Sequence, residues 1–224
     1  MQRLLSFELL SWWHAGSGRG AGTILDATVH RSPLGLPEIP GKTVKGLLRA
    51  AMDRAVEAGV VDPGRQQRWF GSFLLGDNAV LSSPGNEEPG DAAMRHLEEA
   101  RFSTEPGELW FGSAVLPEAW QRWAARPLPQ EADGSVHRTA PELEQLFSTV
   151  ASTAIDQMGR AAEHTLRVRE VAAPMTLKAT LIGPDDDAWP ADIEASLLFI
   201  HALGTRRNRG YGRLRATLET YSCA

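Results

Sequence analysis

The chain has 224 residues, of which 42% are hydrophobic, and a formal net charge of −5 at pH 7. This length fits one domain or two small ones, and the apolar fraction is enough for an ordinary core. The composition excludes several protein classes. No apolar run reaches the roughly 18 residues of a membrane span, and the N-terminus does not read as a signal peptide. The single cysteine, Cys223, excludes an intrachain disulfide and a cysteine zinc cluster. We therefore expect a cytoplasmic protein without a membrane partner.

The charge is unevenly distributed along the chain. Residues 204–215 carry five arginines and no acid, and residues 1–50 carry six lysines and arginines against three acids. Residues 62–118, in contrast, carry ten acids against four arginines. The acidic total argues against a generally basic nucleic-acid-binding protein, but a basic groove within an acidic protein is compatible with RNA binding. The alternative to a basic groove is that the charged residues are distributed by chance along the chain.

The first half of the chain is predicted to contain a half-buried strand and an amphipathic helix. Apolar residues alternate over residues 2–13, which indicates the strand. A glycine-rich loop and an extended segment follow, and three prolines exclude a helix over 32–41. Apolar residues then recur at helical spacing over 42–59, where Gly59 ends the helix. A shorter helix is predicted over 65–75.

The second half is predicted to contain three strands and one helix. The strands are expected over 108–116, 171–182 and 211–221, and the helix over 190–203 with Leu198 in its core face. Residues 148–170 show neither helical nor strand periodicity. The order strand, helix, strands, helix, strand predicts an α+β fold with a ferredoxin-like (RRM-like) core and long insertions.

Two glycine-rich basic segments are the candidate binding elements. Residues 39–49 read Ile-Pro-Gly-Lys-Thr-Val-Lys-Gly-Leu-Leu-Arg, and residues 204–214 read Gly-Thr-Arg-Arg-Asn-Arg-Gly-Tyr-Gly-Arg-Leu. Glycines let backbone amides approach a ligand closely, and the flanking cations attract an anionic backbone. The start of the first helix also favours an anion, although an ordinary proline-started helix is the alternative. A nucleotide-binding P-loop is excluded because Leu36 stands where that motif needs glycine.

In order and spacing, these segments resemble the RAMP superfamily of CRISPR–Cas effector complexes, above all the backbone subunit of type III complexes. Three further segments share the resemblance: Trp13-His14-Ala15-Gly16, the apolar-Asp-x-x-Val pattern within 25–31, and the Phe70-Gly71 step. Residues 154–170 resemble the family's thumb, an insertion that reaches over the guide–target duplex. Ser113 departs from the family, which often has an acid at this position.

The resemblance implies a single RAMP domain over residues 1–224 that includes a thumb-like insertion over 148–170. Its implied partners are CRISPR RNA, target RNA, other type III effector subunits and copies of itself in a filament. The residues expected to contact RNA are His14, Lys42, Thr43, Lys45, Arg49, Arg206, Arg207, Arg209 and Arg213. The residues expected to act in the thumb are Ile155, Met158 and Arg160.

The resemblance also implies a catalytic residue. In target-cleaving members an Asp in the loop after the first strand cuts target RNA with a divalent cation, and by position this residue is Asp26. Mg²⁺ or another divalent cation would then serve cleavage only. Two alternatives remain open: a turn or capping role for Asp26 in a scaffold subunit that only binds RNA, and a metal-independent endoribonuclease that processes precursor CRISPR RNA through His14 or His30.

Overall fold

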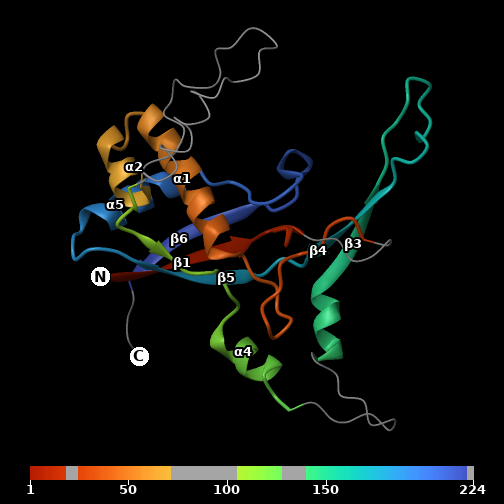
Figure 1. The fold of residues 1–224 in the computed structure, drawn as a ribbon, viewed down its shortest axis with the longest axis horizontal. Coiled ribbons are helices and arrows are strands. Elements are labelled where there is room, and N and C mark those ends of the chain that lie inside the picture. The colour runs from red at the N-terminus through yellow and green to blue at the C-terminus, as the bar shows by residue number, and fades with distance from the viewer. Residues whose placement is uncertain (19–24, 72–104, 128–139, 221–224) are drawn as a thin grey trace, which may run out of the picture.

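The computed structural model describes residues 1–18, 25–71, 105–127 and 140–220 (Figure 1). A four-stranded antiparallel sheet lies at its centre, in the order β2–β5–β1–β6. The strands are β1 (Gln2–Leu9), β2 (Trp110–Phe111), β5 (Thr176–Ile182) and β6 (Leu214–Thr220). Helix α1 (Gly41–Glu57) follows β1, and helix α5 (Ala188–Leu197) connects β5 to β6. The predicted ferredoxin-like order of elements is confirmed.

Alternation along the strands places the core between the sheet and a helical layer. Leu5 and Phe7 are fully buried on β1 and lie opposite Ala179 and Leu177 of β5. Figure 1 shows α1, α2 (Pro63–Phe70) and α5 on one side of the sheet and the short helix α4 (Glu118–Ala124) on the other. The helix α1 buries the stripe that its periodicity predicted, namely Val44, Leu48, Ala51, Met52 and Ala55. Within the described residues, no helix is long and apolar enough to cross a membrane.

Several predicted boundaries are corrected. Residues 171–172 belong to a separate strand, because Pro174 cannot donate to a strand ladder and interrupts the predicted strand. The helix predicted over 190–203 spans Ala188–Leu197, and Leu198, which was predicted in its core face, is 75% exposed. The first strand ends at Leu9, although Trp13 is still fully buried. The ends of the segments predicted over 65–75 and 211–221 lie partly outside the described residues.

A long hairpin projects from the core (Figure 1). Its strands are β3 (Phe147–Ser152) and β4 (Arg167–Ala172), which pair antiparallel from Phe147 opposite Ala172 to Ser152 opposite Arg167. At its tip, one oxygen of Asp156 accepts hydrogen bonds from the amides of Met158 and Arg160 at 2.8 Å. The sequence showed no periodicity here because much of the hairpin is exposed on both faces, so an alternating apolar pattern is not required.

Buried polar contacts hold the base of this hairpin against the core. Glu170 is only 6% exposed, and its carboxylate accepts hydrogen bonds from the Val29 amide at 2.9 Å and from Arg31 at 2.6 Å. Its carbonyl accepts a hydrogen bond from Nδ1 of His14 at 2.6 Å. The 3-10 helix η1 (Pro141–Leu146) adds Glu144, which pairs with Arg31 at 2.7 Å. These contacts join four segments that are distant in sequence.

The ion pair between Arg31 and Glu144 shifts both groups toward their charged forms. The hydrogen bond from Arg31 lowers the pKa of Glu144. Burial alone would lower the pKa of Arg31, but its hydrogen bonds to Glu144 and Glu170 outweigh burial and raise that pKa. Because the folded pKa of Glu144 is lowered, its contribution to stability is present above the pKa of an unfolded glutamate. That contribution is lost as the pH falls through the lowered folded value.

We expect Glu170→Ala to destabilise the protein by about 3 kcal/mol, since it leaves the buried Val29 amide without its acceptor and leaves Arg31 with one carboxylate partner instead of two. The control is Glu142→Ala, which breaks the exposed pair between Arg126 and Glu142 and should cost less than about 1 kcal/mol. Urea denaturation followed by circular dichroism measures both. Equal midpoints for the two variants would contradict the role given to Glu170.

Candidate nucleic-acid interface

The first basic segment begins α1 directly beside strand β2. A side chain at Gly41 would overlap the carbonyl oxygen of Phe111, so the close approach of β2 requires glycine there. The Gly41 amide donates to Oγ of Ser113 at 3.3 Å, and the amides of Thr43 and Val44 both donate to the Pro40 carbonyl. Three of the first four amides of α1 therefore bind within the protein. What this helix start offers an anion is chiefly its cationic side chains.

The polar and cationic residues of this segment differ in their exposure and in their contacts within the protein. Lys42 is exposed, whereas Thr43, Lys45 and Arg49 are half-buried. Nζ of Lys45 lies 6.0 Å from the ring centroid of Phe111, and Arg49 donates to the Gly71 carbonyl at 3.1 Å. Lys42 and Lys45 are thus the cations of this segment best placed to meet a ligand.

The second basic segment packs its backbone against the segment that follows β1. Gly204 has a φ of +79°, and a side chain there would overlap the carbonyl oxygen of His14. The Thr205 amide donates to that same oxygen at 3.3 Å, and the Gly212 amide donates to the Trp12 carbonyl at 2.8 Å. These contacts fix both ends of a loop that we call the arginine loop, residues 204–213.

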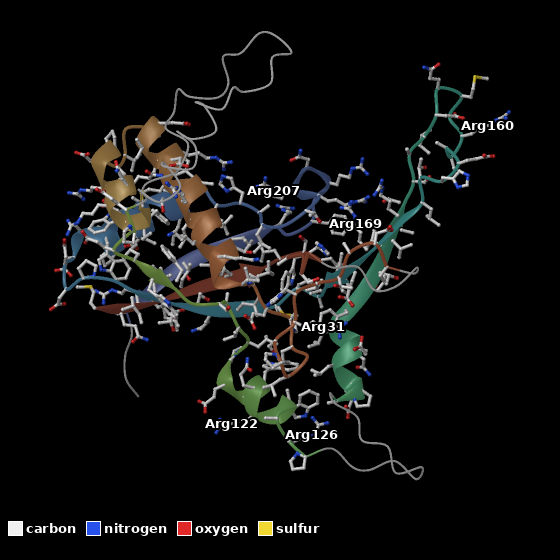
Figure 2. All side chains as sticks on the ribbon, viewed as in Figure 1. Arg31, Arg122, Arg126, Arg160, Arg169 and Arg207 are labelled. Atoms are coloured by element: carbon white, nitrogen blue, oxygen red, sulfur yellow. The ribbon has the colours of Figure 1, made fainter. Side chains whose placement is uncertain are left out.

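The arginine loop presents its cations outward and toward the hairpin. Arg207, Arg209 and Arg213 are exposed, and the first two lie on the 3-10 helix η2 (Arg207–Arg209; Figure 2). Arg206 is half-buried, has a left-handed backbone with a φ of +61°, and donates to Oγ of Ser152 on β3. A non-glycine residue in this conformation costs about 1–2 kcal/mol, which other contacts must offset.

A cavity of about 330 Å³ lies between helix α1 and the arginine loop. Arg207 and Asn208 of the arginine loop line it together with Leu47, Ala50 and Arg54 of α1, so the cavity reaches the first basic segment at Leu47 and not at its cations. The fold therefore places side by side two motifs that are separated by about 160 positions in the sequence. This proximity is what a continuous binding surface requires.

The two histidines near these segments occupy different environments. His14 is only 4% exposed, and its Nδ1 donates to the Glu170 carbonyl, so its ring supports the hairpin base from within. Nε2 of His30 lies 4.0 Å from a carboxylate oxygen of Glu38. The predicted contact of His14 with RNA stays a prediction, and its position indicates an architectural role as well.

Asp26 lies alongside strand β4 at the base of the hairpin. It is exposed, its amide donates to the Val168 carbonyl at 2.9 Å, and its Oδ2 accepts from the Val168 amide at 2.7 Å. Its other oxygen, Oδ1, forms no hydrogen bond within the described part of the chain. The same part contains no group of three or more His, Cys, Asp and Glu residues that could hold a metal ion. Asp26 thus has a structural role in holding its segment against β4, and one carboxylate oxygen is left for other contacts.

The tip of the hairpin exposes apolar side chains. Ile155 is 63% exposed and Met158 is 79% exposed, and the exposed Arg160 lies at the far end (Figure 2). Nothing in the described residues covers them. Their predicted insertion between bases stays a prediction.

Comparison with known proteins identifies the family. The family model for the RAMP superfamily matches residues 6–215. The chain belongs to the RAMP superfamily. A comparison with curated proteins finds no match.

Solved structures with the same fold come from CRISPR effector complexes. A chain of the Type III-B Cmr-beta complex bound to cognate target RNA has a TM-score of 0.61 at 9% identity, with 97% of each chain covered. A chain of Cmr-beta in its apo state gives 0.60 at 11% identity, again over 97% of each chain. A chain of a Type IV-B CRISPR complex gives 0.53 at 17% identity, over 100% of this chain and 92% of the other. At these identities the likeness is one of fold.

We expect Gly204→Ala to destabilise this RAMP protein more than Gly210→Ala. Both glycines have positive φ values, so each substitution carries a conformational cost of about 1 kcal/mol. Only at Gly204 does the new side chain also overlap a backbone atom, because the position beside Gly210 is open. Thermal unfolding of the two variants measures the difference, and equal melting temperatures would contradict the packing described for the arginine loop.

Proposed function

We propose that this protein is an RNA-binding subunit of a CRISPR effector complex and that it holds the CRISPR RNA along α1 and the arginine loop. The observation that carries the proposal is that the arginine loop lies against helix α1, across a cavity that both elements line. Family membership and the likeness to chains of effector complexes support it. A phosphodiester backbone is the ligand whose regular negative charge matches exposed cations on two adjacent elements.

Replacing the cations of either segment should reduce the salt dependence of RNA binding. Each lost phosphate contact lowers the slope of log affinity against log salt by about 0.7 for a single strand. Arg207→Ala with Arg209→Ala, and Lys42→Ala with Lys45→Ala, should therefore each lower the slope by about 1.4. Fluorescence anisotropy with labelled single-stranded RNA over a salt series measures this.

The control for the arginine pair is Arg122→Ala with Arg126→Ala, which removes the same charge from positions on and just after α4. Figure 2 shows Arg122 on the opposite side of the sheet from Arg207. The control should bind as the wild type does. If the control loses as much affinity as the arginine-loop variant, RNA binding depends on the total charge of the protein and not on this interface.

The proposal extends to the assembly. Copies of this subunit would follow one another along the CRISPR RNA, and the guide would pair with target RNA beside the projecting hairpin. The Cmr-beta neighbours favour a type III complex, and the Type IV-B neighbour is compatible with a subunit that binds RNA without cutting it.

We propose further that Asp26 serves metal-dependent cleavage of the target RNA. A single carboxylate suits Mg²⁺, which usually takes one or two carboxylates and completes its shell with water and substrate phosphates. When bound, such an ion supplies charge stabilisation at the phosphoryl oxygens. The hydrogen bond from the Val168 amide holds the Asp26 carboxylate in a fixed orientation beside the hairpin base. The same bond would also serve a scaffold subunit, which is the alternative.

Asp26→Asn separates these two roles. The amide oxygen of Asn can still accept from the Val168 amide, but the variant lacks the negative charge that a divalent cation needs. In complexes assembled with guide and target RNA and supplied with Mg²⁺, we expect no cleavage by the variant and target affinity within a few-fold of wild type. Cleavage at the wild-type rate would overturn the assignment, and a wild-type complex that never cuts would establish the scaffold alternative.

A further inference from the structure

Arg169 on strand β4 is a cation without a partner in the described part of the protein. Its Nε atom is buried and forms no hydrogen bond, and its side chain makes no ion pair with any described carboxylate. Other arginines near the core behave differently: Arg31 binds two glutamates and Arg65 binds Asp192 at 2.9 Å. A half-buried charged group left without an acceptor is costly, and such exceptions require an explanation.

The register of the hairpin places Arg169 on a face without acidic residues. Arg169 lies opposite Val150, and Arg167 lies opposite Ser152, so these four side chains share one face. Glu170 lies on the other face, where it binds Arg31. The charges on the first face are therefore of one sign within the paired strands.

The arginine loop adds a further cation to this same face. Arg206 donates to Oγ of Ser152, whose side chain is a diagonal neighbour of Arg169 across the two strands. Diagonal neighbours lie within reach of long side chains. Figure 2 shows Arg169 at the hairpin base, next to the loop that carries Arg207. Arg206 adopts its unfavourable left-handed backbone at this point, which is the kind of local strain that accompanies binding sites.

We propose that Arg169 and Arg206 together bind one backbone phosphate of single-stranded RNA at the junction of the hairpin and the arginine loop. This site deepens the proposed function and rests on it. Guanidinium groups bind phosphate oxygens through paired N–H donors, and an anion between the two arginines removes their mutual repulsion. The RNA backbone would then run from the arginine loop to the foot of the hairpin.

The decisive variant is Arg169→Met, which keeps the aliphatic stem and removes both the charge and the unpaired Nε. Because a buried unsatisfied donor disappears, the melting temperature should stay equal or rise. RNA affinity should fall about tenfold or more, as expected for a charge-assisted hydrogen bond, with the salt slope lower by about 0.7. Arg169→Lys keeps the positive charge but lacks the planar guanidinium donors. It should therefore keep the salt slope of the wild type but only part of its RNA affinity. Arg122→Met is the matched control and should change neither quantity.

A double-mutant cycle tests whether the two arginines share one phosphate. The variant with both Arg169→Met and Arg206→Ala should lose less affinity than the product of the two single losses. If wild type binds RNA and Arg169→Met retains its affinity and slope, the inference fails while the proposed function stands. If wild type binds no RNA, the proposed function fails and the inference with it. Stabilisation by inorganic phosphate that needs Arg169, with unchanged RNA binding, would assign the site to free phosphate and overturn the RNA assignment.

Discussion

The functional parts of this protein depend on the hydrogen bonds that the buried oxygen atoms of Glu170 accept. A two-stranded hairpin without an apolar cover is marginally stable by itself and has no means of fixing its own direction. Here its base is held by hydrogen bonds from Val29, Arg31 and His14, all directed to one residue. The Arg31 guanidinium also lies 3.7 Å from the ring centroid of Phe147. Low exposure strengthens these bonds and makes their loss costly, so the hairpin is attached at a defined angle.

The same junction links the hairpin to the arginine loop. His14 donates through its ring to Glu170, and its carbonyl oxygen accepts from Thr205. Arg206 then reaches back to Ser152 on the hairpin. These contacts connect the segment after β1, the arginine loop and the hairpin, each to the other two. A surface held in this way loses little conformational freedom when a ligand binds, which favours affinity without additional contacts.

The sequence allowed prediction of those parts of the fold in which one face is buried. The periodicity of Val44, Leu48 and Met52 defined α1, and the alternation of Leu5 and Phe7 defined β1. The hairpin strands could not be read because much of their length is exposed on both faces. The short sequence motifs predicted where α1 and the arginine loop occur along the chain. That the two lie close together in space follows only from the order of the strands in the sheet. Arg169 was missed since its distinguishing feature is the lack of a partner, which no sequence pattern records.

The glycines of the two motifs separate folding requirements from binding requirements. Gly41, Gly204 and Gly212 each face a backbone carbonyl that a side chain would overlap, so packing alone accounts for them. Gly46 differs, because it is exposed in the middle of α1 and a side chain there would overlap no atom of another described segment. Glycine at such a position costs about 1 kcal/mol relative to alanine, and nothing in the described structure offsets that cost. Gly46 also lies one residue after Lys45, on the helix that lines the shared cavity. A ligand that approaches the backbone of α1 closely would account for this glycine, as it would for the cations beside it.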